Sequence, residues 1–194
     1  MRIACCGVGA LGSTMVAAIR NLDAELRLID FDRVESKNLA AQWFVKQSVG
    51  KPKVDAVRLQ LANFYGLPLA RIHAMQARLG SHNAAQLIAD CDLVVDCFDN
   101  AASRLVLADA ARAAGAPLLH GALAGDGSFG LVRWDERFTP DRETEPGAAT
   151  CEGGEHLPMI ALVGATLARA IQDFVRAGTR HDYAISLSGV ARTT

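Results

Sequence analysis

The chain has 194 residues, of which 51% are apolar and 21% charged, and its formal net charge at pH 7 is -1. This length and composition suit a single domain over residues 1–194 with a sizeable core. The near-neutral charge and the lack of any Lys/Arg run argue against nucleic-acid partners and membrane surfaces, so we expect neither.

Apolar runs of strand length alternate with helical patterns over the first 123 residues. In chain order we predict a strand at 2–6, a helix at 11–22, a strand at 25–30, a short helix at 38–45, a helix at 51–65, a strand at 71–75, a short helix at 84–89, a strand at 93–98, a helix at 101–114 and a strand at 118–123. Val54, Val57 and Leu61 recur at helical spacing, and Gly115 before Pro117 marks a helix end. This alternation is typical of a mostly parallel sheet.

The pattern changes in the last third of the chain. Residues 127–134 alternate like an antiparallel strand, and residues 135–156 form a long polar loop. A strongly apolar helix follows at 157–175, and a last strand is predicted at 183–187. The sequence therefore predicts an α/β, Rossmann-like three-layer fold with a mostly parallel sheet and antiparallel C-terminal strands.

The cysteines and the first residues bear on cellular location. Glycine interrupts the first apolar stretch at Gly7, which disfavours a signal peptide. The five cysteines are an odd number without a C-x-x-C pair, so we expect neither a disulfide framework nor zinc. A cytoplasmic location is the expectation that follows.

A glycine motif opens the first predicted helix. Gly7, Gly9 and Gly12 form G-V-G-A-L-G directly after the first strand. Glycines permit a tight turn and close approach of backbone to a phosphate at the helix N-terminus. Asp30 ends the second strand, where a carboxylate can bind a ribose hydroxyl. This motif indicates a nucleotide but does not separate a dinucleotide from ATP.

Three ordered segments make the pattern more specific. From Asp30 the chain reads D-F-D-R-V-E-S-K-N-L-A-A-Q, then G-K-P-K at residues 50–53, then V-V-D-C-F-D-N-A-A-S-R at residues 94–104. In order and spacing they resemble the ThiF/MoeB/HesA family, the bacterial branch of the ubiquitin-activating superfamily, from Met1 to about residue 178. The resemblance implies an enzyme that uses ATP and Mg²⁺ to adenylate a small ubiquitin-like or sulfur-carrier protein ending in Gly-Gly. It also implies a homodimer, which the apolar helix at 157–175 favours as well.

The resemblance assigns roles to particular residues. Those implied in ATP binding are Gly7, Gly9, Gly12, Asp30, Asp32, Asn38, Lys53, Asp99 and Asn100. Asp30 is expected to hold the ribose, Asn38 and Lys53 the phosphates, and Asp99 the Mg²⁺ ion, with Lys53 and Asp99 catalytic. Two alternatives stay open: Lys53 as a solvated lysine of a first helical turn, and Asp99 as the N-cap of the following helix.

The chain also departs from the family pattern. Ala41 stands where the family motif carries a phosphate-binding arginine, and the family's arginine upstream of the first strand has no counterpart. Lys37, Arg137 and Arg142 are candidates to compensate. We expect Ala41→Arg to speed pyrophosphate exchange by about tenfold or more, because a positioned cation acts on transition-state charge.

Two further residues are weighed as functional. Cys151 lies on the long loop shortly before the apolar helix, where sulfur-transferring relatives can carry a covalent cysteine, so it is a tentative nucleophile. The alternative, a loop cysteine without a role, stays open and is favoured. His120, at the end of a strand, is better explained as structural.

The activity has competing readings. The first is adenylation; the alternative is a weak or inactive nucleotide- or protein-binding module, acting with or without a partner subunit. A nicotinamide dehydrogenase would share the glycine turn but would not explain G-K-P-K or D-N-A-A-S-R.

Overall fold

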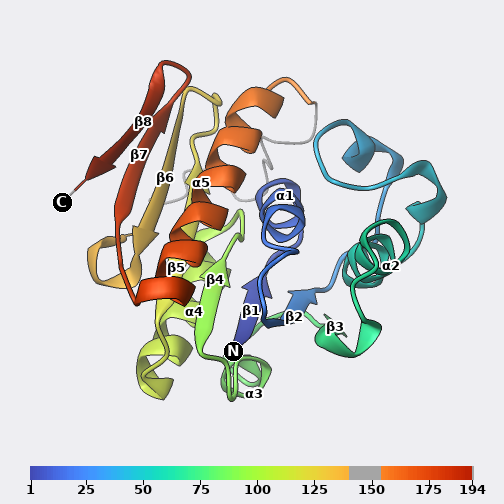
Figure 1. The fold of residues 1–194 in the computed structure, drawn as a ribbon, viewed down its shortest axis with the longest axis horizontal. Coiled ribbons are helices and arrows are strands. Elements are labelled where there is room, and N and C mark those ends of the chain that lie inside the picture. Colours follow the sequence, from blue (N-terminus) through green and yellow to red (C-terminus); the bar gives the residue numbers. More distant parts are fainter. Residues whose placement is uncertain (140–153, 194) are drawn as a thin grey trace.

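One eight-stranded sheet organises the part of the chain that the structure, a computed structural model, describes: residues 1–139 and 154–193. Its strands are β1 (Arg2–Cys6), β2 (Glu25–Asp30), β3 (Ile72–Gln76), β4 (Leu93–Asp96), β5 (Leu118–Leu123), β6 (Phe129–Trp134), β7 (Asp182–Ser186) and β8 (Gly189–Thr193). Their order is β3-β2-β1-β4-β5-β6-β7-β8. Strands β1 to β5 pair in parallel, and β6, β7 and β8 add antiparallel (Figure 1).

Helices cover both faces of this sheet, which confirms the predicted three-layer fold. Figure 1 shows α5 (Leu157–Ala177) and α1 (Ala10–Ala18) in front of the sheet, with α2 (Lys53–Tyr65) beside them. The opposite face carries α3 (Ala84–Leu87) and α4 (Ala101–Ala114). Two separate apolar clusters lie between the layers, one on each face.

Strand β1 shows why the central strands read as continuous apolar runs. Successive strand residues point to opposite faces, so Ile3 and Cys5 pack in one cluster while Ala4 and Cys6 pack in the other. All four are fully buried. A parallel strand covered on both faces needs apolar side chains at every position.

Helix α5 is the core helix of the β5–β7 region. Its residues Val163 and Leu167 are fully buried, and Gly164 lies against Thr14 of α1. By length and composition α5 is long and apolar enough to cross a membrane, and half of its apolar window is buried. A core helix passes the same test, so this is weak evidence for a membrane span.

The structure corrects several predicted boundaries. In place of a helix at 38–45 there are two 3-10 helices, η1 (Ser36–Ala40) and η2 (Lys46–Ser48). A reciprocal capping box between Glu35 and Asn38 ends the extended chain and starts η1 early. Helix α2 begins at Lys53 instead of residue 51, because Pro52 occupies the N-cap.

Strand β8 was not predicted. Four of its five residues are exposed, so it lacks the apolar alternation that marks a half-covered strand. It exists because β7 turns back on itself and pairs Ser186 with Gly189. Two observed strands are shorter than predicted. Strand β4 ends at Asp96 instead of residue 98, and β6 starts at Phe129 instead of residue 127.

Candidate functional site

The glycine turn between β1 and α1 is packed against the end of β4. Gly7 has a φ of +83°, and a Cβ on it would lie 2.9 Å from the backbone carbonyl of Cys97. A Cβ on Gly12 would lie 1.9 Å from the Gly7 carbonyl oxygen. These two glycines are therefore required by the fold of the turn itself.

Gly9 differs from its two neighbours. A Cβ added there would meet no protein atom within 4 Å, and Gly9 is the N-cap of α1 without a side-chain cap. The space beside Gly9 thus adjoins free backbone N–H groups of a helix N-terminus. Such a place suits an anionic ligand that approaches the backbone closely.

Asp30 is held in place by the same turn. Its side chain accepts hydrogen bonds from the backbone N–H of Val8, at 2.7 Å, and of Asp32, at 2.8 Å. Burial raises the pKa of Asp30, and the Lys53 ammonium and these two N–H donors oppose that rise. The carboxylate oxygens retain further acceptor sites, so a ribose hydroxyl can bind there in addition.

Lys53 lies at the start of α2, close to the carboxylates of Asp30 and Asp32. Its Nζ is 3.0 Å from Oδ2 of Asp32, and its side chain is only 9% exposed against 44% for Asp32. The backbone also joins the two, since Lys53 N–H donates to the Asp32 carbonyl at 2.9 Å. The alternative of a solvated first-turn lysine is wrong: the structure brings Asp30, Asp32 and Lys53 together.

Asn38 is 2% exposed and has a local partner. Its Oδ1 accepts from the backbone N–H of Glu35 at 2.8 Å, within the capping box of η1. The geometry therefore gives Asn38 a structural role, and its proposed contact with phosphate stays a prediction.

The loop after β4 lies against the glycine turn, since a Cβ on Gly7 would lie 2.9 Å from the Cys97 carbonyl and 3.1 Å from the Phe98 nitrogen. Asp99 and Asn100 follow these two residues in the same loop. Asn100, and not Asp99, is the N-cap of α4, since its side chain accepts from the Ser103 N–H at 2.9 Å. The N-cap alternative for Asp99 is therefore wrong. Asp99 is exposed, and its Oδ1 receives Nδ2 of Asn100 at 3.3 Å.

This donor set fits one kind of metal site. Among residues 1–139 and 154–193 no group of three or more His, Cys, Asp or Glu side chains could hold a metal. Mg²⁺ is commonly bound by one or two carboxylates together with substrate phosphates. A single accessible carboxylate at Asp99 fits that arrangement, but no geometry for a metal is implied.

The two described cations considered as substitutes for the motif arginine each have a carboxylate partner. Arg137 donates to the buried carboxylate of Asp182, and Lys37 lies 3.7 Å from Glu35. Ala41 itself is 4% exposed and belongs to the core cluster. Arg142 and the tentative nucleophile Cys151 lie outside the described residues.

The four described cysteines are poor nucleophiles by environment. Burial raises the pKa of Cys5 to about 12 and raises the pKa values of Cys6 and Cys97 well above the usual value of a thiol. The pKa of Cys91 is also raised, chiefly by burial. Buried thiols with raised pKa values suit a structural role in the core better than a nucleophilic one.

Sequence reasoning missed a buried charge network below the loop that carries Asp99. Asp96, Arg104 and His120 meet there, and Asp96 and His120 are 0% and 1% exposed. The only sequence signal was an acidic residue interrupting the apolar run V-V-D-C-F. Such a residue in a buried strand requires partners that the sequence does not name.

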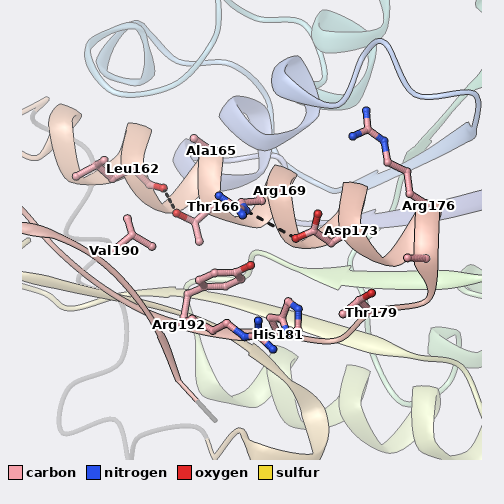
Figure 2. A pocket seen from close by; sticks show the side chains of 12 residues that line it. Leu162, Ala165, Thr166, Arg169, Asp173, Arg176, Thr179, His181, Val190 and Arg192 are labelled. Atoms are coloured by element: carbon pink, nitrogen blue, oxygen red, sulfur yellow. Dashed lines mark hydrogen bonds and ion pairs between the residues drawn. The ribbon is translucent and has the colours of Figure 1, made fainter.

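A groove of about 770 Å³ lies apart from these residues, between α5 and the β7–β8 hairpin. Figure 2 shows Arg169 and Asp173 on α5, with Arg192 and His181 across the groove. Its lining includes none of the residues implied in nucleotide binding.

Comparisons with known proteins bear on both fold and chemistry. The ThiF family model matches residues 1–179. The chain is 39% identical over 124 residues to a sulfur carrier protein adenylyltransferase of Thermus thermophilus, covering 60% of this chain and 43% of that protein. It is 32% identical over 179 residues to the molybdopterin-synthase adenylyltransferase of Escherichia coli, covering 84% and 68%.

The chain thus spans less than half of the Thermus protein and about two thirds of the E. coli one. Among solved structures, E. coli MccB with ATP has a TM-score of 0.76 at 14% identity, covering 100% of this chain and 63% of that one. PaaA has a TM-score of 0.69 at 16% identity, covering 99% and 63%. At this identity the likeness shows the fold alone.

Proposed function

Since this chain belongs to the ThiF family, we propose that it is an ATP-dependent adenylyltransferase that activates a small ubiquitin-like or sulfur-carrier protein. A carboxylate oxygen of the carrier's C-terminal glycine attacks the α-phosphorus of ATP. The bond from that phosphorus to the bridging oxygen breaks, pyrophosphate leaves, and an acyl adenylate is formed. Relatives named for this chemistry at 32–39% identity support the proposal.

One observation carries the choice of ATP over a dinucleotide. Both ligand classes need the glycine turn and Asp30. In addition, the buried Lys53 and the exposed Asp99 follow strands β2 and β4 at the same edge of the sheet. In the proposed complex Gly9 and the N-terminus of α1 face phosphate, and Asp30 and Asp32 hold the ribose. Lys53 stabilises the charge that develops on pyrophosphate.

Mg²⁺ is the second component of this proposal. Asp99 would hold the ion, which would neutralise phosphate charge during the transfer. Asp99 itself is placed by Asn100, which caps α4 and donates to Asp99.

Ala41 favours a second candidate function. This residue is buried in the core, and Lys37 and Arg137, the described candidates to replace the motif arginine, have carboxylate partners. A module that holds nucleotide or a protein partner without efficient catalysis is therefore the alternative. In that case a partner subunit would supply the missing cations.

Titration calorimetry with ATP plus Mg²⁺ and with NAD tests the ligand. We expect binding of MgATP and weaker or no binding of NAD; tighter binding of NAD would contradict the proposal. Exchange of labelled pyrophosphate into ATP, with a carrier protein ending in Gly-Gly, then separates the two candidates. Exchange supports adenylation, whereas MgATP binding without exchange favours the binding module.

A further inference from the structure

A chain of hydrogen-bonded polar side chains connects the loop after β4 to the end of β6. Its central member is His120 on β5, which is 1% exposed. His120 Nδ1 lies 2.7 Å from Oδ2 of Asp96, and its Nε2 lies 3.1 Å from Oδ1 of Asp135. One imidazole ring therefore bridges two carboxylates that belong to different segments.

At the first end, the Asp96 carboxylate holds the backbone of the residue before Asp99. Its Oδ1 accepts from the Phe98 N–H at 2.9 Å. Its Oδ2 also receives Nη1 of Arg104 at 2.9 Å, and Nη2 of Arg104 donates to the Phe98 carbonyl. Both backbone polar groups of Phe98 are thus fixed by the network.

At the second end, the network reaches the 3-10 helix η4 (Asp135–Arg137). Arg112 of α4 donates to both oxygens of Asp135, at 2.6 and 2.8 Å. The ring of Phe138 stacks on His120 with centroids 4.1 Å apart and 14° between the planes. His120 is therefore held from its edge and from its face.

We propose that His120 is a positioning residue for the nucleotide site: through Asp96 it fixes Phe98, and thereby the place from which Asp99 reaches the ligand. Imidazole suits this position because its two nitrogens lie on different edges of one rigid ring and can each bind a carboxylate. Removing the Nδ1 contact leaves a fully buried carboxylate with fewer partners, which loosens the backbone it holds. The link to the ligand rests on the proposed function, but the link to Phe98 does not.

Two variants separate the two contacts of His120. In His120→Asn the side-chain amide nitrogen takes nearly the place of Nδ1, so the Asp96 contact is kept and the Asp135 contact is lost. In His120→Gln the nitrogen takes nearly the place of Nε2, and the Asp96 contact is lost. Both lose the stacking on Phe138 equally, so they are matched. His73→Asn on β3 is the control, since that histidine is half exposed.

Hydrogen exchange of the peptide containing Phe98 is the first measurement, and it needs no ligand. We expect His120→Gln to speed exchange at Phe98 by about tenfold or more, the effect of losing one charge-assisted hydrogen bond. His120→Asn should stay within about threefold of wild type, and His73→Asn should be unchanged. Equal exchange in His120→Asn and His120→Gln would overturn the proposal.

ATP affinity with Mg²⁺ and with EDTA is the second measurement. In His120→Gln we expect the Kd for MgATP to rise about tenfold while the Kd for ATP in EDTA stays as in wild type, because Asp99 acts through the metal. Equal weakening in both conditions would mean a general loss of structure and would overturn the positioning role. If wild type binds no ATP, the proposed function fails, and the exchange comparison still decides the link from His120 to Phe98.

Asp135→Asn is a milder variant should His120→Gln not fold. It keeps the side-chain volume and weakens the contact at Nε2, since a bond to a neutral acceptor has about half the strength of one to a carboxylate. The expected result is an exchange rate at Phe98 within about threefold of wild type, because His120 keeps its contact with Asp96. A rise of tenfold or more would assign the hold on Phe98 to Asp135 and would overturn the proposal.

Discussion

Asp30 holds the fold of the glycine turn and is also the residue proposed to bind the ribose. Its carboxylate fixes the glycine turn through the N–H of Val8 and the start of the next loop through that of Asp32. The sequence suggested a ribose ligand only. We therefore expect Asp30→Ala to weaken MgATP binding and also to lower the free energy of unfolding by about 2 kcal/mol, measured by titration calorimetry and urea unfolding.

Asp30→Asn is the matched control, because it keeps the shape and one acceptor oxygen. It should lose less stability than Asp30→Ala, since one of the two backbone N–H donors keeps its acceptor. If Asp30→Ala binds MgATP as tightly as wild type, the assignment of the ribose to Asp30 is wrong.

The cysteines allow a second prediction at the scale of single residues. Limited alkylation at neutral pH, followed by mass spectrometry, should label Cys5, Cys6 and Cys97 very slowly, because burial both shields these thiols and raises their pKa values. That Cys151 labels faster than all of them stays a prediction from sequence. Labelling of Cys97 at the same rate as Cys151 would remove the reason to consider Cys151 a nucleophile.

At the scale of elements, the turn from β1 to α1 contains two glycines that the fold requires and one, Gly9, that the fold does not require. Gly12→Ala should lower stability by about 1–3 kcal/mol, because its Cβ would meet the Gly7 carbonyl at 1.9 Å. Gly9→Ala should leave the melting temperature nearly unchanged, since its Cβ meets no protein atom within 4 Å. Its MgATP affinity should nevertheless fall, because the added methyl group occupies the space proposed for phosphate.

Thermal unfolding and MgATP titration of the two glycine variants provide the test. The two variants should lose different properties: Gly12→Ala should lose stability, and Gly9→Ala should lose MgATP affinity. A Gly9→Ala protein that binds MgATP like wild type would place the phosphate elsewhere.

The segment from η1 to η2 bears on the absent arginine. Ala41 packs in the core, so Ala41→Arg must accommodate a long cationic side chain at a position 4% exposed. We expect it to lower the free energy of unfolding by about 1–3 kcal/mol. Ala40→Arg, one residue earlier and exposed, should change stability little.

Urea unfolding of both arginine variants measures this difference. Equal stability of Ala41→Arg and Ala40→Arg would show that a long side chain at position 41 can reach solvent. Pyrophosphate exchange must then be compared at temperatures where Ala41→Arg is folded. Faster exchange there would support a phosphate clamp at this position.

For the whole molecule, the structure removes one argument for a dimer. The apolar face of α5 packs on α1 and on the sheet, so it does not require a second copy of the chain. The homodimer now rests on the family resemblance alone and remains a prediction. Light scattering should give twice the mass of the chain, independent of concentration; a monomer mass at all concentrations would contradict it.

The predictable part of the fold follows from local patterns. Five parallel strands, the antiparallel change at β6 and the core helix α5 were each visible as an apolar period of the right length. The segment from residue 31 to 52 was less predictable. Its 3-10 helices depend on the Glu35–Asn38 capping box and on backbone bonds from Val34 to Lys51 and from Lys53 to Asp32. Strand β8 carries almost no apolar signal and depends on β7 as its partner.

The sequence by itself determined the α/β class, the place of the glycine turn and the family, because glycine spacing, apolar period and short motifs are local properties of the chain. Only the tertiary structure decided which side chains meet. It paired Lys53 with Asp32, made Asn100 the N-cap in place of Asp99, and buried Ala41. It also joined Asp96 to His120, 24 positions away. Such contacts depend on how strands and helices far apart in sequence pack together, and a charge inside a strand signals only that it needs a partner.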